Sequence, residues 1–102
     1  MADAVSERKI LVINCGSSSL KYEVWQMPER VSLGKGIVER IGELKGRIVQ
    51  NTPRGEYARS VQVPHHKMAM QLVREALTDP ARGILKDLSE IAGVGHRVVH
   101  GG

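Results

Sequence analysis

The sequence predicts a mixed α/β domain from the order of two kinds of apolar pattern. Short apolar and β-branched runs separated by turn residues occupy the first part of the chain, as expected for hairpin strands. From Pro64 the apolar residues recur at spacings of three and four, which is typical of an amphipathic helix. A last β-branched run follows over residues 91–100. Strands, then a helix, then a strand form a mixed α/β or α+β unit.

The first predicted elements form a hairpin. Lys9–Asn14 is a run typical of a buried strand, and it ends at residues 15–19, which are Gly- and Ser-rich like a turn. Residues 20–27 alternate and are expected to return as the second strand. The alternation separates two faces, with Leu20, Tyr22 and Val24 on one and Lys21, Glu23 and Trp25 on the other.

The remaining elements follow from the same signals. Pro64 suits a helix start and Asp79-Pro80 a helix end. We expect residues 1–8 to be a flexible tail and residues 51–55 to be a loop. The other predicted elements are strands over 31–41, 47–50 and 57–63, a helix over 65–78, a short second helix over 83–89, and a final strand over 91–100.

Composition restricts the class of protein. The 102 residues fit one small domain or part of a larger one, and the net charge of +4 suits an anionic partner. A nucleic-acid binder is one alternative, but the chain lacks the aromatic platforms of single-strand binders. The single cysteine, Cys15, excludes an internal disulfide. Without a secretory segment or an apolar run of about 20 residues, a soluble cytoplasmic protein is expected.

The first motif that suits ligand binding runs from Asn14 to Lys21. Gly16 allows the backbone to turn sharply, and three serines follow it. Their hydroxyls and backbone N–H groups suit a phosphate, and Lys21 brings a positive charge to the same place. An ordinary solvated hairpin turn is the alternative. The pattern is neither a Walker loop nor a dinucleotide fingerprint.

The second motif is the strand that contains Arg97. Arg97 and Val99 share one face of it, so a forked guanidinium stands beside a small apolar wall. That pair suits a short aliphatic acid, and the alternative is a surface arginine on a partly buried strand. His96 and His100 are separated by roughly 13 Å along a strand, which is too far for two ligands of one metal ion.

The other reactive side chains have simpler interpretations. We expect Cys15 to pack behind the turn as a small residue, because no base can be named for it. His65 and His66 at the helix start are expected to be solvated and to satisfy nearby backbone groups.

Together the motifs resemble the acetate kinase family. ILVINCGSSSLKY at residues 10–22 matches the amino-terminal signature of that family, and VGHRVVHGG at residues 94–102 matches its second block. The resemblance covers residues 9–102. It implies the ribonuclease H-like α/β fold of the acetate and sugar kinase/actin superfamily, of which this chain would be the amino-terminal part, truncated after Gly102.

The resemblance also implies roles for residues. Gly16, Ser17, Ser19 and Lys21 would bind the phosphates of ATP, and Asn14 would lie on the Mg²⁺ side of the site. Arg97 would be the catalytic arginine that binds the carboxylate or acyl phosphate, and Val99 would contact the methyl group of the substrate.

The implied reaction is reversible phosphoryl transfer from ATP to acetate, with Mg²⁺ as cofactor. A homodimer is expected for the full-length enzyme, and neither a membrane nor nucleic acid is expected as a partner. Propionate kinase and a non-catalytic phosphate- or nucleotide-binding module are alternatives. Family members are several times longer, so the isolated chain is expected to be inactive and to leave apolar faces and strand edges uncovered.

Overall fold

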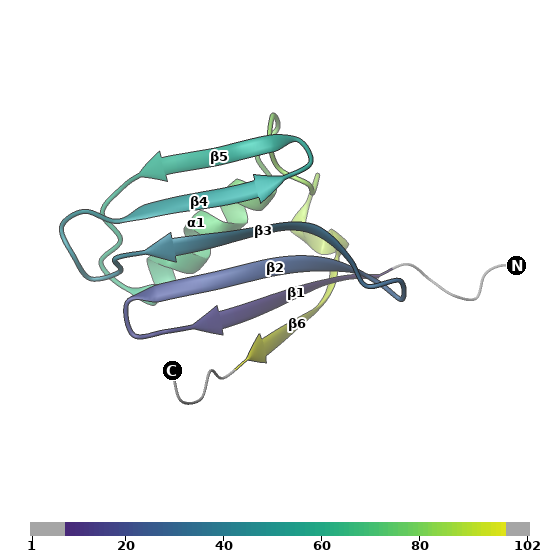
Figure 1. The fold of residues 1–102 in the computed structure, drawn as a ribbon, viewed down its shortest axis with the longest axis horizontal. Coiled ribbons are helices and arrows are strands. Elements are labelled where there is room, and N and C mark those ends of the chain that lie inside the picture. The colour runs from purple at the N-terminus through teal and green to yellow at the C-terminus, as the bar shows by residue number, and fades with distance from the viewer. Residues whose placement is uncertain (1–7, 98–102) are drawn as a thin grey trace, which may run out of the picture.

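The computed structural model describes residues 8–97, which form a six-stranded sheet with one α-helix packed against it (Figure 1). In chain order the elements are β1 (Arg8–Cys15), β2 (Ser19–Met27), β3 (Val31–Glu39), β4 (Arg47–Thr52), β5 (Gly55–Ser60), α1 (His66–Leu77), the 3₁₀ helix η1 (Leu88–Glu90) and β6 (Ile91–Arg97). The predicted order of hairpin strands, helix and final strand is confirmed. No helix within residues 8–97 is long and apolar enough to cross a membrane.

The strand order brings the two sequence motifs together. The sheet runs β5-β4-β3-β2-β1-β6, and β6 pairs with β1 in parallel while the other neighbours are antiparallel. On β1, Asn14 stands opposite Lys21 of β2 on one side and opposite Arg97 of β6 on the other. Figure 1 shows β1 and β6 ending at the same side of the sheet.

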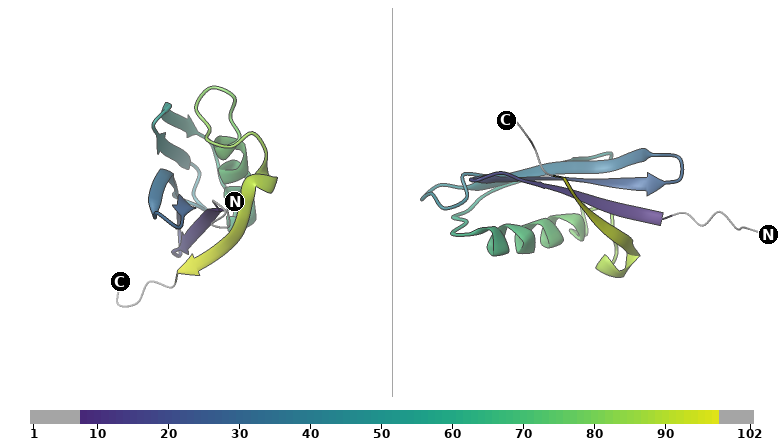
Figure 2. Two further views of the ribbon diagram at one scale, coloured as in Figure 1. Left: turned by 90° about the vertical axis from the view of Figure 1, so that its right-hand side faces the viewer. Right: turned by 90° about the horizontal axis from the view of Figure 1, so that it is seen from below.

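One face of the sheet forms the core. Leu20, Tyr22 and Val24 are buried there, as their alternation predicted. Helix α1 lies across this face and turns an apolar stripe toward it (Figure 2). The buried helix residues that make up the stripe are Ala69, Leu72, Val73, Ala76 and Leu77.

A buried polar chain connects two strands to the helix. The Tyr22 hydroxyl donates to Gln50 Oε1 at 2.7 Å, and Gln50 Nε2 donates to the carbonyl of Ala76 at 2.8 Å. Gln50 is fully buried, so both groups would be costly to leave unpaired. Burial, and secondly the nearby Tyr57, raise the pKa of Tyr22, which keeps its hydroxyl a neutral donor.

The opposite face of the sheet carries no helix within the described part of the chain (Figure 2). Apolar side chains there are only half-buried, namely Val12, Trp25, Ile37 and Val49. Together with the polar side chains between them they form what we call the open face. The expectation of uncovered apolar faces and strand edges stays a prediction.

The predicted second helix over 83–89 is wrong. Only Leu88–Glu90 is helical there, as one 3₁₀ turn. Side chains satisfy the backbone of the preceding loop instead. The Asp79 carboxylate accepts from the N–H groups of Ala81 and Arg82, while Arg54 donates to the carbonyls of Pro80 and Gly83. Inside the predicted range, the N–H groups of Ile84 and Leu85 donate to the carbonyl of Leu77, and those of Lys86 and Asp87 donate to Glu90 Oε2. These groups therefore have partners without forming a helix.

The hairpin between β4 and β5 is tighter than predicted. The expected loop over 51–55 is wrong in extent, because Asn51 and Thr52 continue β4 and Gly55 begins β5. Gly55 has a φ of 121°, a conformation that favours glycine and closes the short turn. Strand β5 ends at Ser60 rather than at residue 63, and the carbonyl of Val63 instead accepts from the N–H of Gly42.

Candidate active site

The site is built around the turn between β1 and β2, which we call the serine turn (residues 15–19). The N–H of Gly16 donates to the carbonyl of Ser19 at 2.8 Å and closes the turn. A Cβ on Gly16 would lie 3.0 Å from Ser19 Oγ, so a larger residue would crowd that hydroxyl. Ser17 and Ser18 are exposed at the tip. The predicted turn is confirmed.

Two other segments hold the serine turn from outside. The N–H of Ile41, just after β3, donates to the carbonyl of Ser18 at 2.9 Å. The Nε2 of His66, the first residue of α1, lies 2.9 Å from the carbonyl oxygen of Gly16. The turn is therefore fixed to the body of the domain through its carbonyls.

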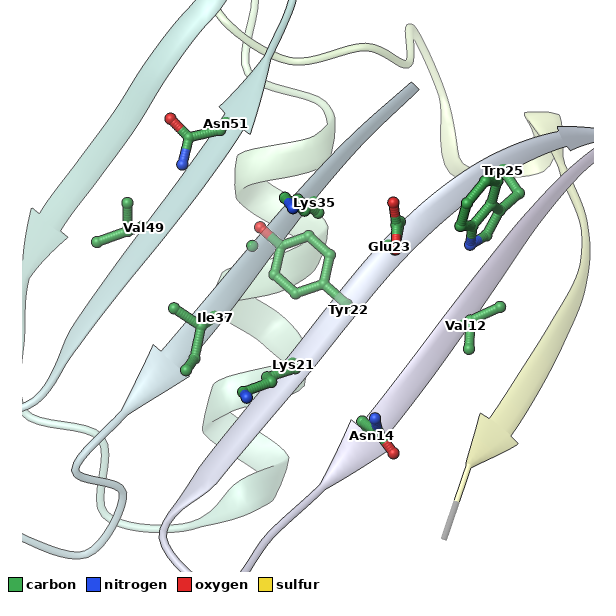
Figure 3. Close-up of a pocket in the computed structure, with 11 residues that line it drawn as sticks. Val12, Asn14, Lys21, Tyr22, Glu23, Trp25, Lys35, Ile37, Val49 and Asn51 are labelled. Atoms are coloured by element: carbon green, nitrogen blue, oxygen red, sulfur yellow. The ribbon is translucent and has the colours of Figure 1, made fainter. Parts of the chain in front are cut away.

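Asn14 and Lys21 project onto the open face beside the serine turn. They face each other across β1 and β2, and Figure 3 shows them at one end of a depression whose other end holds Trp25. The depression has a volume of about 350 Å³. Other side chains that line it include Val12, Glu23, Lys35, Ile37, Val49 and Asn51.

The depression is cationic near the serine turn. Lys21 has no ion-pair partner among residues 8–97. Glu23 lies farther along β2 and accepts a hydrogen bond from Ser32 Oγ at 2.6 Å. An anion at the Asn14 end would therefore be next to the Lys21 charge and farther from Glu23.

Arg97 completes a row of three residues. It is the last residue of β6, and its backbone stands opposite Asn14 in the parallel register. In the sequence Asn14 and Lys21 belong to one motif and Arg97 to another, and the sheet puts the backbones of all three side by side. Val99 lies outside the described residues.

The expectation that Cys15 packs behind the turn is wrong, because the thiol is exposed. Cys15 has the same strand parity as Leu11 and Ile13, which are buried. It lies at the very end of β1, where no described element covers it. The only imidazole in hydrogen-bond contact with the turn, within residues 8–97, is His66, and it contacts a backbone oxygen rather than the thiol.

The residues fit a magnesium ion that is held mainly by phosphates. No group of three His, Cys, Asp or Glu side chains within residues 8–97 is arranged to hold a metal. Asn14 Oδ1, however, is buried and has no hydrogen-bond partner in the described structure. An amide oxygen is a ligand type that Mg²⁺ accepts directly or through water, and nucleotide phosphates commonly supply the rest.

His65 and His66 satisfy backbone groups, as expected, but sequence reasoning did not find which ones. His65 caps α1 by accepting from the N–H of Met68 at 3.2 Å. The contact of His66 with the serine turn joins residues that are far apart in the chain, and no local pattern indicated it. No sequence motif indicated the depression on the open face either.

The strand order, the packed helix and the serine turn identify the fold class. This is the amino-terminal part of the ribonuclease H-like domain found in the acetate and sugar kinase/actin superfamily. The model of the acetokinase family matches residues 9–102, and the chain belongs to that family.

Comparison with individual proteins supports the same family. The chain is 51% identical over 96 residues to the acetate kinase of Moorella thermoacetica, and the aligned region covers 92% of this chain and 24% of that protein. It is 53% identical over 96 residues to the acetate kinase of Natranaerobius thermophilus, with the same coverage of 92% and 24%. The chain therefore spans about a quarter of the length of these relatives.

Solved structures agree with the fold. A crystal structure of Porphyromonas gingivalis acetate kinase superposes with a TM-score of 0.85 at 38% identity, over 93% of this chain and 24% of that one. A propionate kinase from Francisella tularensis superposes with a TM-score of 0.77 at 30% identity, over 93% of this chain and 23% of that one.

Proposed function

We propose that this chain forms the phosphate- and carboxylate-binding part of an acetate kinase, which transfers a phosphoryl group reversibly between ATP and acetate. The observation that carries the proposal is the row of Lys21, Asn14 and Arg97 beside the serine turn. Family membership and the acetate kinases among its relatives support the choice of reaction.

The serine turn and Lys21 would bind the phosphates of ATP. The exposed hydroxyl of Ser17 and the backbone N–H groups at the tip of the turn are hydrogen-bond donors, and Ser19 adds a hydroxyl at the start of β2. Gly16 permits the close approach of the backbone to the phosphate. Lys21 neutralises charge on the transferred group, and Mg²⁺, when bound near Asn14, would neutralise more of it.

Arg97 would orient the acid. Its guanidinium can bind a carboxylate or an acyl phosphate through two parallel hydrogen bonds. One carboxylate oxygen of acetate then attacks the γ-phosphorus, and the bond from that phosphorus to the oxygen bridging to the β-phosphate breaks. The products are acetyl phosphate and ADP. Positioning and charge neutralisation carry this chemistry, so no covalent nucleophile is needed.

Propionate is the second candidate acid. The superposition on a propionate kinase supports it. We propose Val99 as part of the wall that contacts the alkyl group, and one methylene against such a wall changes specificity by only about 1–3 kcal/mol. The ratio of kcat/KM for acetate to that for propionate decides between the two acids.

Further properties belong to the same proposal. We propose a kinase domain part over residues 9–102, an inactive isolated chain, and a homodimeric, cytoplasmic full-length enzyme. Arg8, the last residue of the expected tail over 1–8, begins β1. The short match to the relatives supports the inactivity, since the chain spans 24% of the Moorella thermoacetica protein.

A chimeric enzyme tests the proposed function. Residues 9–102 replace the matching quarter of the Moorella thermoacetica acetate kinase, and acetyl phosphate is trapped as its hydroxamate. We expect turnover that requires both acetate and ATP. The matched control carries Ser17→Ala with Lys21→Ala and is expected to lose handling of ATP.

Two outcomes would contradict the proposal. A folded chimera without turnover that still binds ATP would support the non-catalytic binding module. An unchanged KM for ATP and an unchanged kcat in the double variant would remove the serine turn and Lys21 from phosphate binding.

A further inference from the structure

We propose that His66 is a positioning residue that fixes the serine turn for phosphate binding, an inference that rests on the proposed function of that turn. The contact is between His66 Nε2 and the carbonyl oxygen of Gly16, at 2.9 Å. A carbonyl oxygen can only accept a hydrogen bond, so Nε2 carries the proton and donates. In the neutral ring Nδ1 is then unprotonated.

His66 is held rigidly enough to serve as an anchor. It is the first residue of α1, and the next turns of that helix bury Ala69, Leu72 and Val73 in the core. His65 caps the helix by accepting from the N–H of Met68, which fixes the backbone just before His66. The imidazole therefore extends from a packed helix rather than from a loop.

The contact sets the direction of a backbone N–H group that can donate a hydrogen bond to a phosphate. The only cis peptide bond within residues 8–97 is Met27-Pro28, so the bond from Gly16 to Ser17 is trans. In a trans peptide the carbonyl and the following N–H point in opposite directions. Because His66 holds the Gly16 carbonyl toward α1, the N–H of Ser17 points away from the helix.

That N–H is available for a ligand. The Ser17 N–H has no protein partner within the described residues, and the residue is exposed. Ile41 holds the carbonyl of Ser18 in the same way, so the turn is clamped at two points. A preset N–H donor loses less entropy on binding an oxyanion than a mobile one, and loss of the clamp should weaken binding.

Substitutions at His66 in the 102-residue chain test this role, with inorganic tripolyphosphate as the probe. In His66→Gln the amide nitrogen can still donate to the Gly16 carbonyl, whereas His66→Ala removes the donor. His65→Asn is the matched control, because it removes the neighbouring imidazole and keeps a side chain that caps helices well. Backbone amide spectra report folding, the Ser17 amide shift reports binding, and imidazole ¹⁵N shifts report the tautomer.

We expect the unsubstituted chain to bind tripolyphosphate with a shift at the Ser17 amide. His66→Ala should raise the Kd about five- to tenfold, as expected for one lost hydrogen bond, and His66→Gln should stay within about twofold. His65→Asn should bind as the unsubstituted chain does, and Nε2 should be protonated in the neutral ring of His66.

Other results would each overturn a different part of this proposal. Binding by the unsubstituted chain that His66→Ala leaves unchanged overturns the role of His66 and leaves the phosphate site standing. Equal weakening in His66→Gln and His66→Ala, or an unprotonated Nε2, overturns donation as the cause. No binding by the folded, unsubstituted chain overturns the phosphate site itself and the role of His66 with it.

Discussion

Asn14 is the residue at which the two halves of the proposed site meet. Its backbone lies between those of Lys21 and Arg97, and its buried Oδ1 has no partner within residues 8–97. A buried acceptor without a partner costs about 1–3 kcal/mol, so native proteins keep few of them. An acceptor of this kind at the end of a strand, beside exposed serines and a lysine, is consistent with a polar ligand arriving there.

Arg97 gives the first prediction at the residue scale, made with the chimeric enzyme. Arg97→Ala should raise the KM for acetate by about 10- to 100-fold, because hydrogen bonds to a charged group contribute about 1.5–3 kcal/mol. The KM for ATP should change much less, because the proposed partner of Arg97 is the carboxylate. Steady-state kinetics with each substrate varied in turn measure both.

The control for Arg97 is Arg74→Ala, which removes an exposed arginine of α1 outside the proposed site. It should leave both KM values unchanged. Equal losses for acetate and ATP in Arg97→Ala would remove Arg97 from carboxylate binding.

Gly36 gives a second prediction, about packing. A Cβ on Gly36 would overlap the Tyr22 ring, with 2.7 Å to its Cε1 and closer approach to its hydroxyl. Gly36→Ala should therefore displace the ring that donates to Gln50 and destabilise the chain by about 1–3 kcal/mol in urea unfolding. Gly95→Ala is the matched control, since a Cβ there meets nothing within 4 Å and Gly95 is also in a strand. Equal effects of the two substitutions would contradict the packing role of Gly36.

At the scale of elements, β6 is fixed at its beginning by an ion pair. Lys9 Nζ of β1 donates to Glu90 Oε1 at 2.6 Å, directly before β6 begins. The other oxygen of Glu90 accepts from the N–H groups of Lys86 and Asp87, at 2.6 and 3.1 Å. This network joins β1 to the strand that ends at Arg97.

The network predicts a dependence of stability on pH. The hydrogen bond from Lys9, followed by those from the N–H groups of Lys86 and Asp87, lowers the pKa of Glu90 from 4.5 to about 2. A lowered pKa stabilises the folded chain above the unfolded value, and that contribution is lost as the pH falls from 4.5 toward 2. Urea unfolding from pH 7 to pH 2.5 should therefore show a smaller loss of stability in Glu90→Gln than in the unsubstituted chain.

The control for the pH effect is Glu75→Gln. Glu75 pairs with Arg59 at 3.3 Å on the surface, with half of each side chain exposed, and such pairs contribute little. It should retain the pH dependence of the unsubstituted chain. A profile for Glu90→Gln that is parallel to the unsubstituted one would show that the Lys9–Glu90 pair does not carry the effect.

At the scale of the whole molecule, the two faces of the sheet differ. α1 covers one face, and the open face keeps Trp25, Ile37 and Val49 half-buried. The chain spans 24% of the Moorella thermoacetica acetate kinase, so most of a complete relative is available to cover that face. Trp25 is the only tryptophan of the chain, which makes it a specific probe of this surface.

Complementation tests this asymmetry. The chain alone should show no turnover, and addition of the remaining three-quarters of the Moorella kinase as a separate polypeptide should restore it. The emission of Trp25 should shift to shorter wavelength in the complex, because covering the open face removes water from the indole. Ile37→Lys should weaken both effects, whereas Gln71→Lys on the exposed side of α1 should weaken neither. Restored turnover without a change in Trp25 emission would show that the open face stays uncovered.

Local patterns in the sequence were enough to predict most of the strands and the helix. Alternation in residues 20–27 identified the buried face of β2, and the change of apolar spacing after Pro64 identified α1. These features depend on neighbours two to four positions apart, which a sequence displays directly. The motifs around Asn14 and Arg97 also indicated the family.

How those parts combine was not predictable from local patterns. The row of Lys21, Asn14 and Arg97 depends on β6 joining β1 in parallel, and the contact of His66 with Gly16 depends on where α1 crosses the sheet. The same is true of the loop after α1, where Arg54 from the turn after β4 donates to the carbonyls of Pro80 and Gly83. Residues that are distant in the chain meet only when the sheet order and the packing of the helix are fixed. A local sequence pattern does not show which distant residues will be in contact.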